Sequence, residues 1–202
     1  MKTIRHIVFD IGKVLIHYDP EIPFRRLIPD AEKRRRFFAD ICTHDWNIEQ
    51  DRGRSWEEAE TLLIAKHPDD AESIRAFRLH WNEMVPHAHD ESVAIMERLI
   101  DGGLDVTMLT NFAADTLMEA KERFAFLKKP RGVTVSGEAK LIKPDREIYD
   151  LHAKSFGLEP AATLFIDDSL KNVDGAIAAG WQAVLFTDAK TLENDLRTLG
   201  IL

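Results

Sequence analysis

The sequence predicts an α/β fold, in which a parallel β-sheet is covered by helices on both faces and a small all-α segment is inserted near the start of the chain. Two observations predict it. From His87 onward, short apolar runs alternate with amphipathic helical patterns, which is typical of right-handed βαβ units. Between about residues 19 and 86 the pattern is helical only. Because one strand precedes that stretch, we expect a discontinuous core of residues 1–16 and 87–202, with residues 17–86 as a helical insert.

The first strand is predicted over residues 4–10 (IRHIVFD), a run rich in Ile, Val and Phe that stops at Asp10. Such a run is typical of a buried central strand. Its last side chain reaches the carboxyl edge of the sheet, where α/β folds bind ligands. A carboxylate there is costly unless chemistry or a counter-charge stabilises it. Asp10 is therefore a candidate nucleophile or metal ligand, and its simpler interpretation is a residue that caps a turn.

The insert is expected to contain several amphipathic helices. Asp30 begins one, Ser55 begins another in a capping-box pattern, and residues 69–85 predict a third. Residues 49–53 are expected to form a loop that could face the active site. Aromatic bulk in this stretch predicts that the helices share a small core of their own; the tryptophans in it are Trp46, Trp56 and Trp81.

The rest of the chain supplies four more strands and five helices. Glycines close several of these helices, as expected of residues that tolerate the conformation of a helix C-terminus. The strands are predicted at residues 104–109, 132–136, 163–166 and 182–186, and the helices at residues 90–100, 112–124, 144–156, 170–179 and 190–199.

Composition limits the class of protein. The chain has 202 residues, 45% of them hydrophobic and 31% charged, and can bury a substantial core. No apolar run approaches the ~20 residues of a membrane span, so no membrane association is expected. The net charge of −8 disfavours nucleic acid as a partner. A single cysteine, Cys42, and an N-terminus without a signal-peptide layout fit a cytoplasmic location.

Polar side chains stand at the ends of three predicted strands and before one helix. They are Asp10, Thr110 with Asn111, Asp167 with Asp168, and Lys143. Alone, each has a simpler explanation: Thr110, Asn111 and the two aspartates could cap helices, and Lys143 could be a solvated surface residue. Strands of a parallel sheet all end at one edge, however, so these groups can meet in one crevice.

Taken together, the groups indicate a site for phosphoryl transfer. Carboxylates that converge repel one another and need a cation, and oxygen ligands favour Mg²⁺, which shares its remaining positions with water and phosphate. Lys143 would supply a fixed positive charge. Thr110, Asn111 and helix N-terminal N–H groups can hold phosphate oxygens.

Four motifs carry a resemblance to a known family. In order they are FDIGKVL from Phe9, LTN from Leu109, IKPD from Ile142 and FIDDS from Phe165. Together they resemble the haloacid dehalogenase-like hydrolase superfamily, and the sequence is similar to its phosphatase-rich subfamily with a helical cap inserted after the first strand. The resemblance covers essentially the whole chain. It implies a three-layer, Rossmann-like core with a helical-bundle cap that governs substrate specificity.

The resemblance also implies a role for each site residue. Asp10 would be the nucleophile that forms an aspartyl-phosphate. Thr110 would bind the phosphoryl group with Asn111 beside it, and Lys143 would bridge Asp10 and the phosphate. The Mg²⁺ ligands would be Asp10, the backbone carbonyl of Gly12 and Asp168, with Asp167 in support or ligating through water.

One position departs from the family pattern. Phosphatases of this superfamily usually carry a second aspartate two residues after the nucleophile, and here that residue is Gly12. Its carbonyl can still ligate a metal, but it has no side chain to protonate the leaving group or activate water. A branch that resembles sugar-phosphate phosphatases has the same Asp-x-Gly arrangement. Gly12 therefore indicates either a leaving group that departs more easily or an acid from elsewhere, such as His17, Asp19 or a residue of the cap.

Three functions remain open from sequence. The first is a Mg²⁺-dependent phosphatase that acts on a small phosphorylated metabolite such as a sugar phosphate. The second is a 2-haloacid dehalogenase, in which Asp10 displaces halide without a metal; Gly12 fits that chemistry, but the pair Asp167 and Asp168 argues against it. The third is a non-catalytic regulatory or binding protein that keeps the fold. Asp10, Lys143 and Asp168 together argue against the third.

Overall fold

The computed structural model describes residues 3–202, and its centre is a five-stranded sheet in which every pairing is parallel. The strand order is β3-β2-β1-β4-β5, so β1 lies in the middle, as its continuous apolar run predicts. The predicted α/β class is confirmed. The strands are β1 (His6–Phe9), β2 (Asp105–Thr110), β3 (Val133–Val135), β4 (Thr163–Asp167) and β5 (Gln182–Leu185).

Helices cover both faces of the sheet, and successive residues of β1 point into different cores. Ile7 and Phe9 join one cluster, to which α7, α8 and α12 contribute, whereas Val8 joins a second, to which α10 and α11 contribute. This alternation follows from the two-residue period of a strand. The helices of this part are α7 (Asp90–Asp101), α8 (Ala114–Arg123), η3 (Ala125–Lys128), α9 (Ser136–Ala139), α10 (Arg146–Phe156), η4 (Pro160–Ala162), α11 (Leu170–Ala178) and α12 (Ala189–Thr198).

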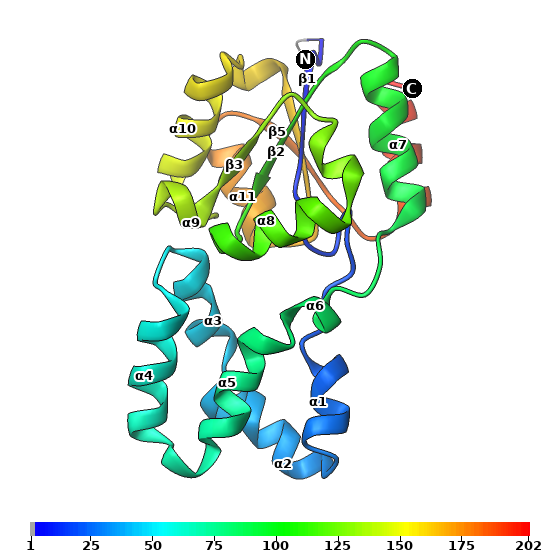
Figure 1. The fold of residues 1–202 in the computed structure, drawn as a ribbon. Helices are drawn as coiled ribbons and strands as arrows, with labels where there is room; N and C mark the ends of the chain where they lie inside the picture. The colour runs from blue at the N-terminus through cyan, green and yellow to red at the C-terminus, as the bar shows by residue number, and fades with distance from the viewer. Residues whose placement is uncertain (1–2) are drawn as a thin grey trace.

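The segment between β1 and α7 forms helices that lie beyond the end of the sheet toward which the strands run, next to α8 and α9 (Figure 1). Their aromatic side chains pack together: Phe77 contacts Trp46 and Trp56, and Phe24 stacks on Phe37. These inserted helices are α1 (Glu21–Leu27), α2 (Ala31–Arg36), the π-helix η1 (Phe37–Ile41), α3 (His44–Asp51), α4 (Trp56–Lys66), η2 (Pro68–Asp70), α5 (Ala71–Leu79) and α6 (Trp81–Met84).

Two predicted helix starts in the insert are confirmed, and one predicted helix is wrong. The Asp30 side chain accepts the Lys33 N–H, and the Ser55 hydroxyl accepts the Glu58 N–H. The single helix predicted over residues 69–85 is divided into η2, α5 and α6, because the backbone leaves α-helical geometry at Asp70 (φ −103°, ψ 11°) and again at His80 (φ −101°, ψ 17°). Residues 49–53 also differ from the expected loop, since α3 continues through Asp51.

Two chain segments connect the inserted helices to the sheet, and they pair with each other. Ile16 and Ala88 form an antiparallel bridge, and the His17 N–H donates to the His87 carbonyl at 3.0 Å. The His17 ring stacks on the His87 ring with 4.9 Å between centroids. The predicted boundaries after residues 16 and 86 fall in this pairing. That residues 17–86 form a separate domain stays a prediction.

None of the helices that the structure describes is long and apolar enough to cross a membrane.

Candidate active site

The polar residues predicted at the strand ends meet at one edge of the sheet. Asp10 follows β1, Thr110 is the last residue of β2, and Asp167 is the last residue of β4. One carboxylate oxygen from each of Asp10, Asp167 and Asp168 lies within 4.8 Å of the others. The parallel register of β1 with β2 and β4 produces this convergence, because the three strands end at the same level.

Lys143 lies between two of these carboxylates, and its side chain is fully buried. Its Nζ is 2.7 Å from Asp167 Oδ2 and 3.1 Å from the Leu109 carbonyl oxygen, both as hydrogen bonds. It is also 2.9 Å from Asp10 Oδ1, as an ion pair without hydrogen-bond alignment. The ammonium group is thus held against the nucleophile candidate by two further acceptors.

Asn111 fixes the backbone of Lys143. Its side-chain amide donates to the Lys143 carbonyl at 3.0 Å and accepts the Lys143 N–H at 2.9 Å. Both ends of the amide are therefore engaged by one residue. These contacts make Asn111 a positioning residue for Lys143, and the predicted contact between Asn111 and phosphate stays a prediction.

Burial and charge shift the ionisation of the pair Asp10 and Lys143. Burial raises the pKa of Asp10 to about 7, against the lowering effect of Lys143, and the charge of Asp167 raises it further. Burial alone would lower the pKa of Lys143, but the carboxylates of Asp10 and Asp167 raise it above its usual value. The lysine therefore stays charged at neutral pH. The positive charge near Asp10 does not offset the effect of its burial, so Asp10 ionises at a higher pH than an ordinary aspartate does.

The two adjacent aspartates differ in how their oxygens are occupied. Asp167 accepts from Lys143, from the Ser169 N–H at 2.8 Å and from the Asn172 amide at 3.0 and 3.1 Å. The carboxylate of Asp168 has only the exposed Lys13 ammonium at 4.0 Å as an ion-pair partner in the described structure. The carboxylate oxygens of Asp168 thus have lone pairs free to bind a ligand, whereas those of Asp167 are largely occupied by hydrogen bonds.

Thr110 presents a buried hydroxyl at the same edge. The residue is 1% exposed, and its Oγ1 has no hydrogen-bond partner within residues 3–202. A buried hydroxyl without a partner is costly, so a ligand oxygen that accepts from it would be stabilised. The cluster of carboxylate oxygens and this hydroxyl fit a hard cation together with an anionic group, and carboxylate oxygens are ligands that Mg²⁺ prefers.

Gly12 leaves open space beside the nucleophile candidate. A Cβ built on Gly12 would have no heavy atom within 4 Å, apart from its chain neighbours. Of the replacement acids proposed from sequence, Asp19 accepts the Glu21 N–H at 2.9 Å and pairs with Arg25 at 2.8 Å. His17 is stacked on His87 in the connecting segments. Both residues therefore have structural roles.

Comparison with known proteins identifies the family. The sequence profile of the haloacid dehalogenase-like hydrolases matches residues 4–180 of the chain. This chain belongs to the haloacid dehalogenase-like hydrolases. A sesquiterpene phosphatase of Aspergillus oryzae is similar to it, with 26% identity over 210 residues that cover 98% of this chain and 97% of that protein.

Solved structures of the family share the fold of this hydrolase. A haloacid dehalogenase family enzyme from Bacteroides thetaiotaomicron, in complex with magnesium, superposes with a TM-score of 0.76 at 20% identity, covering 97% of this chain and 100% of the other. The L-2-haloacid dehalogenase of Xanthobacter autotrophicus, with chloropropionic acid covalently bound, has a TM-score of 0.68 at 17% identity, covering 99% and 85%. At these identities the likeness is one of fold.

Sequence reasoning missed Asn172 and Ser136, and it did not single out Asp51 within residues 49–53, the segment expected to face the site. Asn172 holds Asp167 and follows it by five residues, a spacing at which the first turn of α11 returns the side chain to the strand end. Ser136 and Asp51 lie where α9 meets α3. No local pattern signals this meeting, because it depends on how the inserted helices sit on the sheet.

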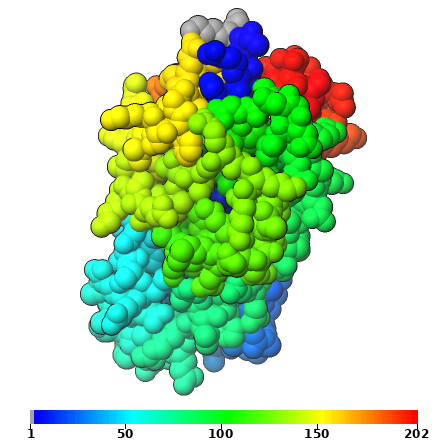
Figure 2. Space-filling model, turned by 45° about the horizontal axis from the view of Figure 1, so that its top comes forward, coloured from blue at the N-terminus to red at the C-terminus, as the bar shows by residue number. Residues whose placement is uncertain are grey.

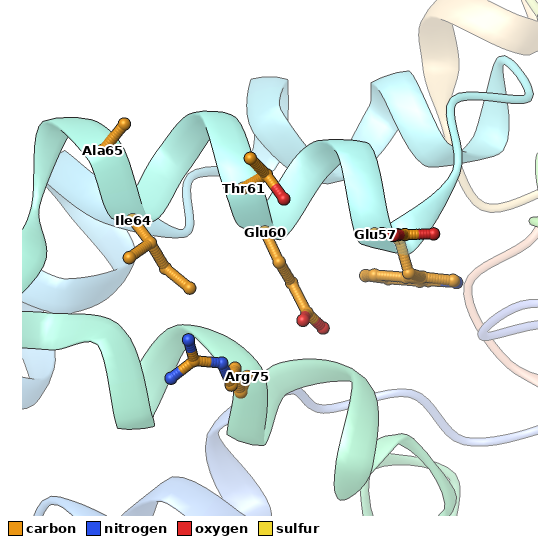
Figure 3. Close-up of a pocket in the computed structure, with 7 residues that line it drawn as sticks. Glu57, Glu60, Thr61, Ile64, Ala65 and Arg75 are labelled. Carbon is orange, nitrogen blue, oxygen red and sulfur yellow. The ribbon is translucent and has the colours of Figure 1, made fainter.

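A surface groove on the inserted helices lies apart from the carboxylates of this hydrolase. It runs between α4 and α5, where Glu60 of α4 and Arg75 of α5 face each other (Figure 3). Its lining includes none of the residues at the strand ends. The chemistry predicted from the motifs therefore belongs to the sheet edge and not to this groove.

Proposed function

We propose that this hydrolase is a Mg²⁺-dependent phosphatase that cleaves a small phosphorylated metabolite through an aspartyl-phosphate on Asp10. One observation carries the proposal: three carboxylates converge, two of them paired with a single buried lysine, near a buried hydroxyl that has no partner within residues 3–202. Three negative charges against one positive charge favour a divalent cation. With the cation bound, the site carries the positive charge that a phosphate dianion needs.

The chain's own groups would perform the following steps. A carboxylate oxygen of Asp10 attacks phosphorus in line with the leaving oxygen. Lys143 holds Asp10 in place and faces the transferred group, while the Thr110 hydroxyl donates to one of its oxygens. Asp10, Asp168 and the Gly12 carbonyl would hold Mg²⁺, with Asp167 in support through its contact with Lys143. When bound, Mg²⁺ neutralises charge on the phosphoryl oxygens.

The substrate class rests on resemblance and on the inserted helices. The Asp-x-Gly motif favours a sugar phosphate, and the similar Aspergillus protein is named a sesquiterpene phosphatase, so a phosphate monoester of an organic alcohol fits both. Residues 17–86 would act as the cap that selects the organic part and excludes water. A cytoplasmic location and the absence of a nucleic-acid partner stay predictions from Cys42 and the net charge of −8.

The test is phosphate release from a panel of sugar and isoprenoid monophosphates, with Mg²⁺ and with a chelator, beside Asp10→Asn. We expect turnover that requires the metal and falls at least about 1,000-fold in Asp10→Asn. Turnover that survives the chelator, or that survives in Asp10→Asn, would contradict the proposal. The absence of phosphate release from any ester, while Mg²⁺ still binds, would favour a non-catalytic protein.

One observation favours dehalogenation as a second candidate. Halide needs no proton on leaving, and Gly12 provides no acid. Against it, a metal-free site that binds a carboxylate substrate gains nothing from three carboxylates of its own. Halide release from 2-chloropropionate in chelator, measured in the same panel, would decide for the dehalogenase.

A further inference from the structure

The residues described so far do not account for proton transfer in the proposed phosphatase reaction. An alkoxide leaving group needs a proton, and the later attack on the aspartyl-phosphate needs a base for water. Gly12 cannot supply either, and Asp19 is held by a helix N–H and by Arg25. A group that does this must lie at the sheet edge near Asp10, and the inserted helices bring a carboxyl group there.

The C-terminal end of α3 is pressed directly onto the sheet edge. The Ser136 hydroxyl donates to the Asp51 carbonyl at 2.5 Å and accepts the Phe112 N–H at 2.9 Å, so one buried oxygen joins α3 to the segment that follows β2. A Cβ on Gly53 would lie 2.8 Å from the Gly137 carbonyl oxygen. In Figure 2 the cyan residues of the insert lie against the yellow-green residues of the core.

The carboxyl group of Asp51 lies near the nucleophile at this contact. It accepts the Ala113 N–H and is within electrostatic range of Asp10 and Lys143. The charge of Asp51 also helps to raise the pKa of Tyr18, a half-buried residue of the connecting segment. The helix end is rigid, because buried Gln50 bonds both to the Trp46 carbonyl and to Arg54. Asp51 thus brings a carboxyl group from the inserted helices close to Asp10.

We propose that Asp51 is the general acid and base of this enzyme, replacing the side chain that Gly12 lacks. The proposal rests on the phosphatase function. In the first step, the Asp10 oxygen forms a bond to phosphorus, the bond from phosphorus to the ester oxygen breaks, and its electron pair takes the proton of the Asp51 carboxyl group, releasing the alcohol. In the second, the Asp51 carboxylate removes a proton from water, the water oxygen attacks phosphorus, and the electron pair of the breaking bond returns to Asp10 as phosphate leaves.

The ionisation of Asp51 suits both steps. Burial raises its pKa to about 7, opposed by the Ala113 N–H and by Lys143 and assisted by the charge of Asp10. A carboxyl group with such a pKa is protonated in part of the molecules at neutral pH and can exchange its proton in either direction.

The experiment compares leaving groups in Asp51→Asn, which keeps an oxygen for the Ala113 N–H. The substrates are p-nitrophenyl phosphate, whose leaving group needs no proton, and the alkyl phosphate of the panel that the wild type cleaves fastest. Formation of the aspartyl-phosphate is measured in single-turnover reactions. The control is Asp45→Asn, which removes an exposed carboxylate from the first turn of the same helix.

We expect the single-turnover rate of Asp51→Asn to fall at least ~100-fold with the alkyl phosphate and less than tenfold with p-nitrophenyl phosphate. Equal losses with both substrates would overturn the proposal and leave the phosphatase function intact. No turnover by the wild type would instead overturn that function. A second readout needs neither metal nor turnover. Asp10 and Asp51 should each give a ¹³C NMR carboxyl signal that titrates near pH 7 in metal-free protein. One of the two signals should vanish in Asp51→Asn, and both should persist in Asp45→Asn. Persistence of both signals in Asp51→Asn would also overturn the proposal.

Discussion

Lys143 is the residue on which the stability and the chemistry of the site both depend. Its ammonium is buried between Asp10 and Asp167, at 2.9 and 2.7 Å. Removing one partner of a buried ion pair leaves an uncompensated charge, which costs far more than the pair itself contributes. Lys143→Met should therefore lower the free energy of unfolding in metal-free protein at pH 8 by about 3–5 kcal/mol.

Urea unfolding measures this change, with Lys171→Met as the control. Lys171 is exposed on α11, and its loss should alter stability by no more than about 0.5 kcal/mol. The destabilisation by Lys143→Met should also shrink as the pH falls through about 7, because Asp10 becomes protonated there. A loss as small as that of the control would contradict the charge balance described for the site.

Residues of the site differ in how readily the sequence reveals them. Asp10, Thr110 and Asp167 were predictable, because strands of a parallel sheet end at one edge and their last residues can be read from apolar runs. Asn111 was found, but its double contact with the Lys143 backbone was not, since both partners lie in irregular segments. Asp51 lies in the segment 49–53 that was expected to face the site, but the sequence does not single it out, because its position depends on where a helix of the insert meets the core.

At the scale of elements, the contact between α3 and α9 should affect the catalytic rate more than the stability of the fold. Gly53 has φ +100°, and a Cβ there would collide with the Gly137 carbonyl. Gly53→Ala must therefore displace the end of α3 together with Asp51. We expect a loss of about 1–2 kcal/mol of stability from the backbone conformation, and a fall in kcat with alkyl phosphates beyond what that loss explains.

Gly103→Ala is the control that separates the two effects of Gly53→Ala, the strain in the backbone and the displacement of α3. Gly103 also has a positive φ, +85°, but a Cβ there would meet nothing within 4 Å, and it lies in the turn between α7 and β2. Thermal unfolding and steady-state kinetics of both variants are the measurements. We expect the two variants to lose similar amounts of stability. Only Gly53→Ala should also lose kcat. Unchanged kcat in Gly53→Ala would show that the contact does not position the catalytic groups.

The sequence predicts where a helix begins when a side chain caps it, as at Asp30 and Ser55. It does not predict a boundary where the backbone changes direction without a glycine or proline. Within residues 69–85 the helix stops at His80, a residue type that helices tolerate, so the helical pattern continues across the break. The turn is imposed by packing, since Phe77 and Trp81 on either side of it are both buried.

At the scale of the whole molecule, ionisation of the site should make stability depend on pH and on Mg²⁺. Burial raises the pKa of Asp10 and of Asp51 from 3.8 to about 7. A carboxyl group whose folded pKa is raised contributes stability that is complete below the unfolded pKa and is lost as the pH rises through the folded pKa. Metal-free protein should therefore lose stability between about pH 4 and 7 from these two groups.

Mg²⁺ should reverse this loss, because it binds the ionised carboxylates. We predict that saturating Mg²⁺ raises Tm more at pH 8 than at pH 5, and that Asp10→Asn reduces the difference. Differential scanning calorimetry in Mg²⁺ and in chelator gives the result. Equal shifts at both pH values would mean that the metal does not bind at these carboxylates.

His152 acts in the opposite direction and limits stability in acid. Its ring lies buried between the hydroxyls of Thr107 and Thr134, at 2.9 and 2.8 Å, and burial lowers its pKa to about 3. A histidine with a lowered folded pKa contributes stability that is complete above its unfolded value and is lost as the pH falls. Between about pH 4 and 6.5 the two effects therefore oppose each other, because the two aspartates lower stability as the pH rises and His152 lowers it as the pH falls.

The most direct test of the account is to capture the covalent intermediate. Wild-type protein is mixed with Mg²⁺ and its best phosphate ester, quenched within one turnover and reduced with borohydride, which converts an aspartyl-phosphate to homoserine. Mass spectrometry of the digested protein should find homoserine at position 10 and unmodified aspartate at positions 51, 167 and 168. Phosphate release with no modification of Asp10, or modification at another aspartate, would contradict the central claim that Asp10 is the nucleophile.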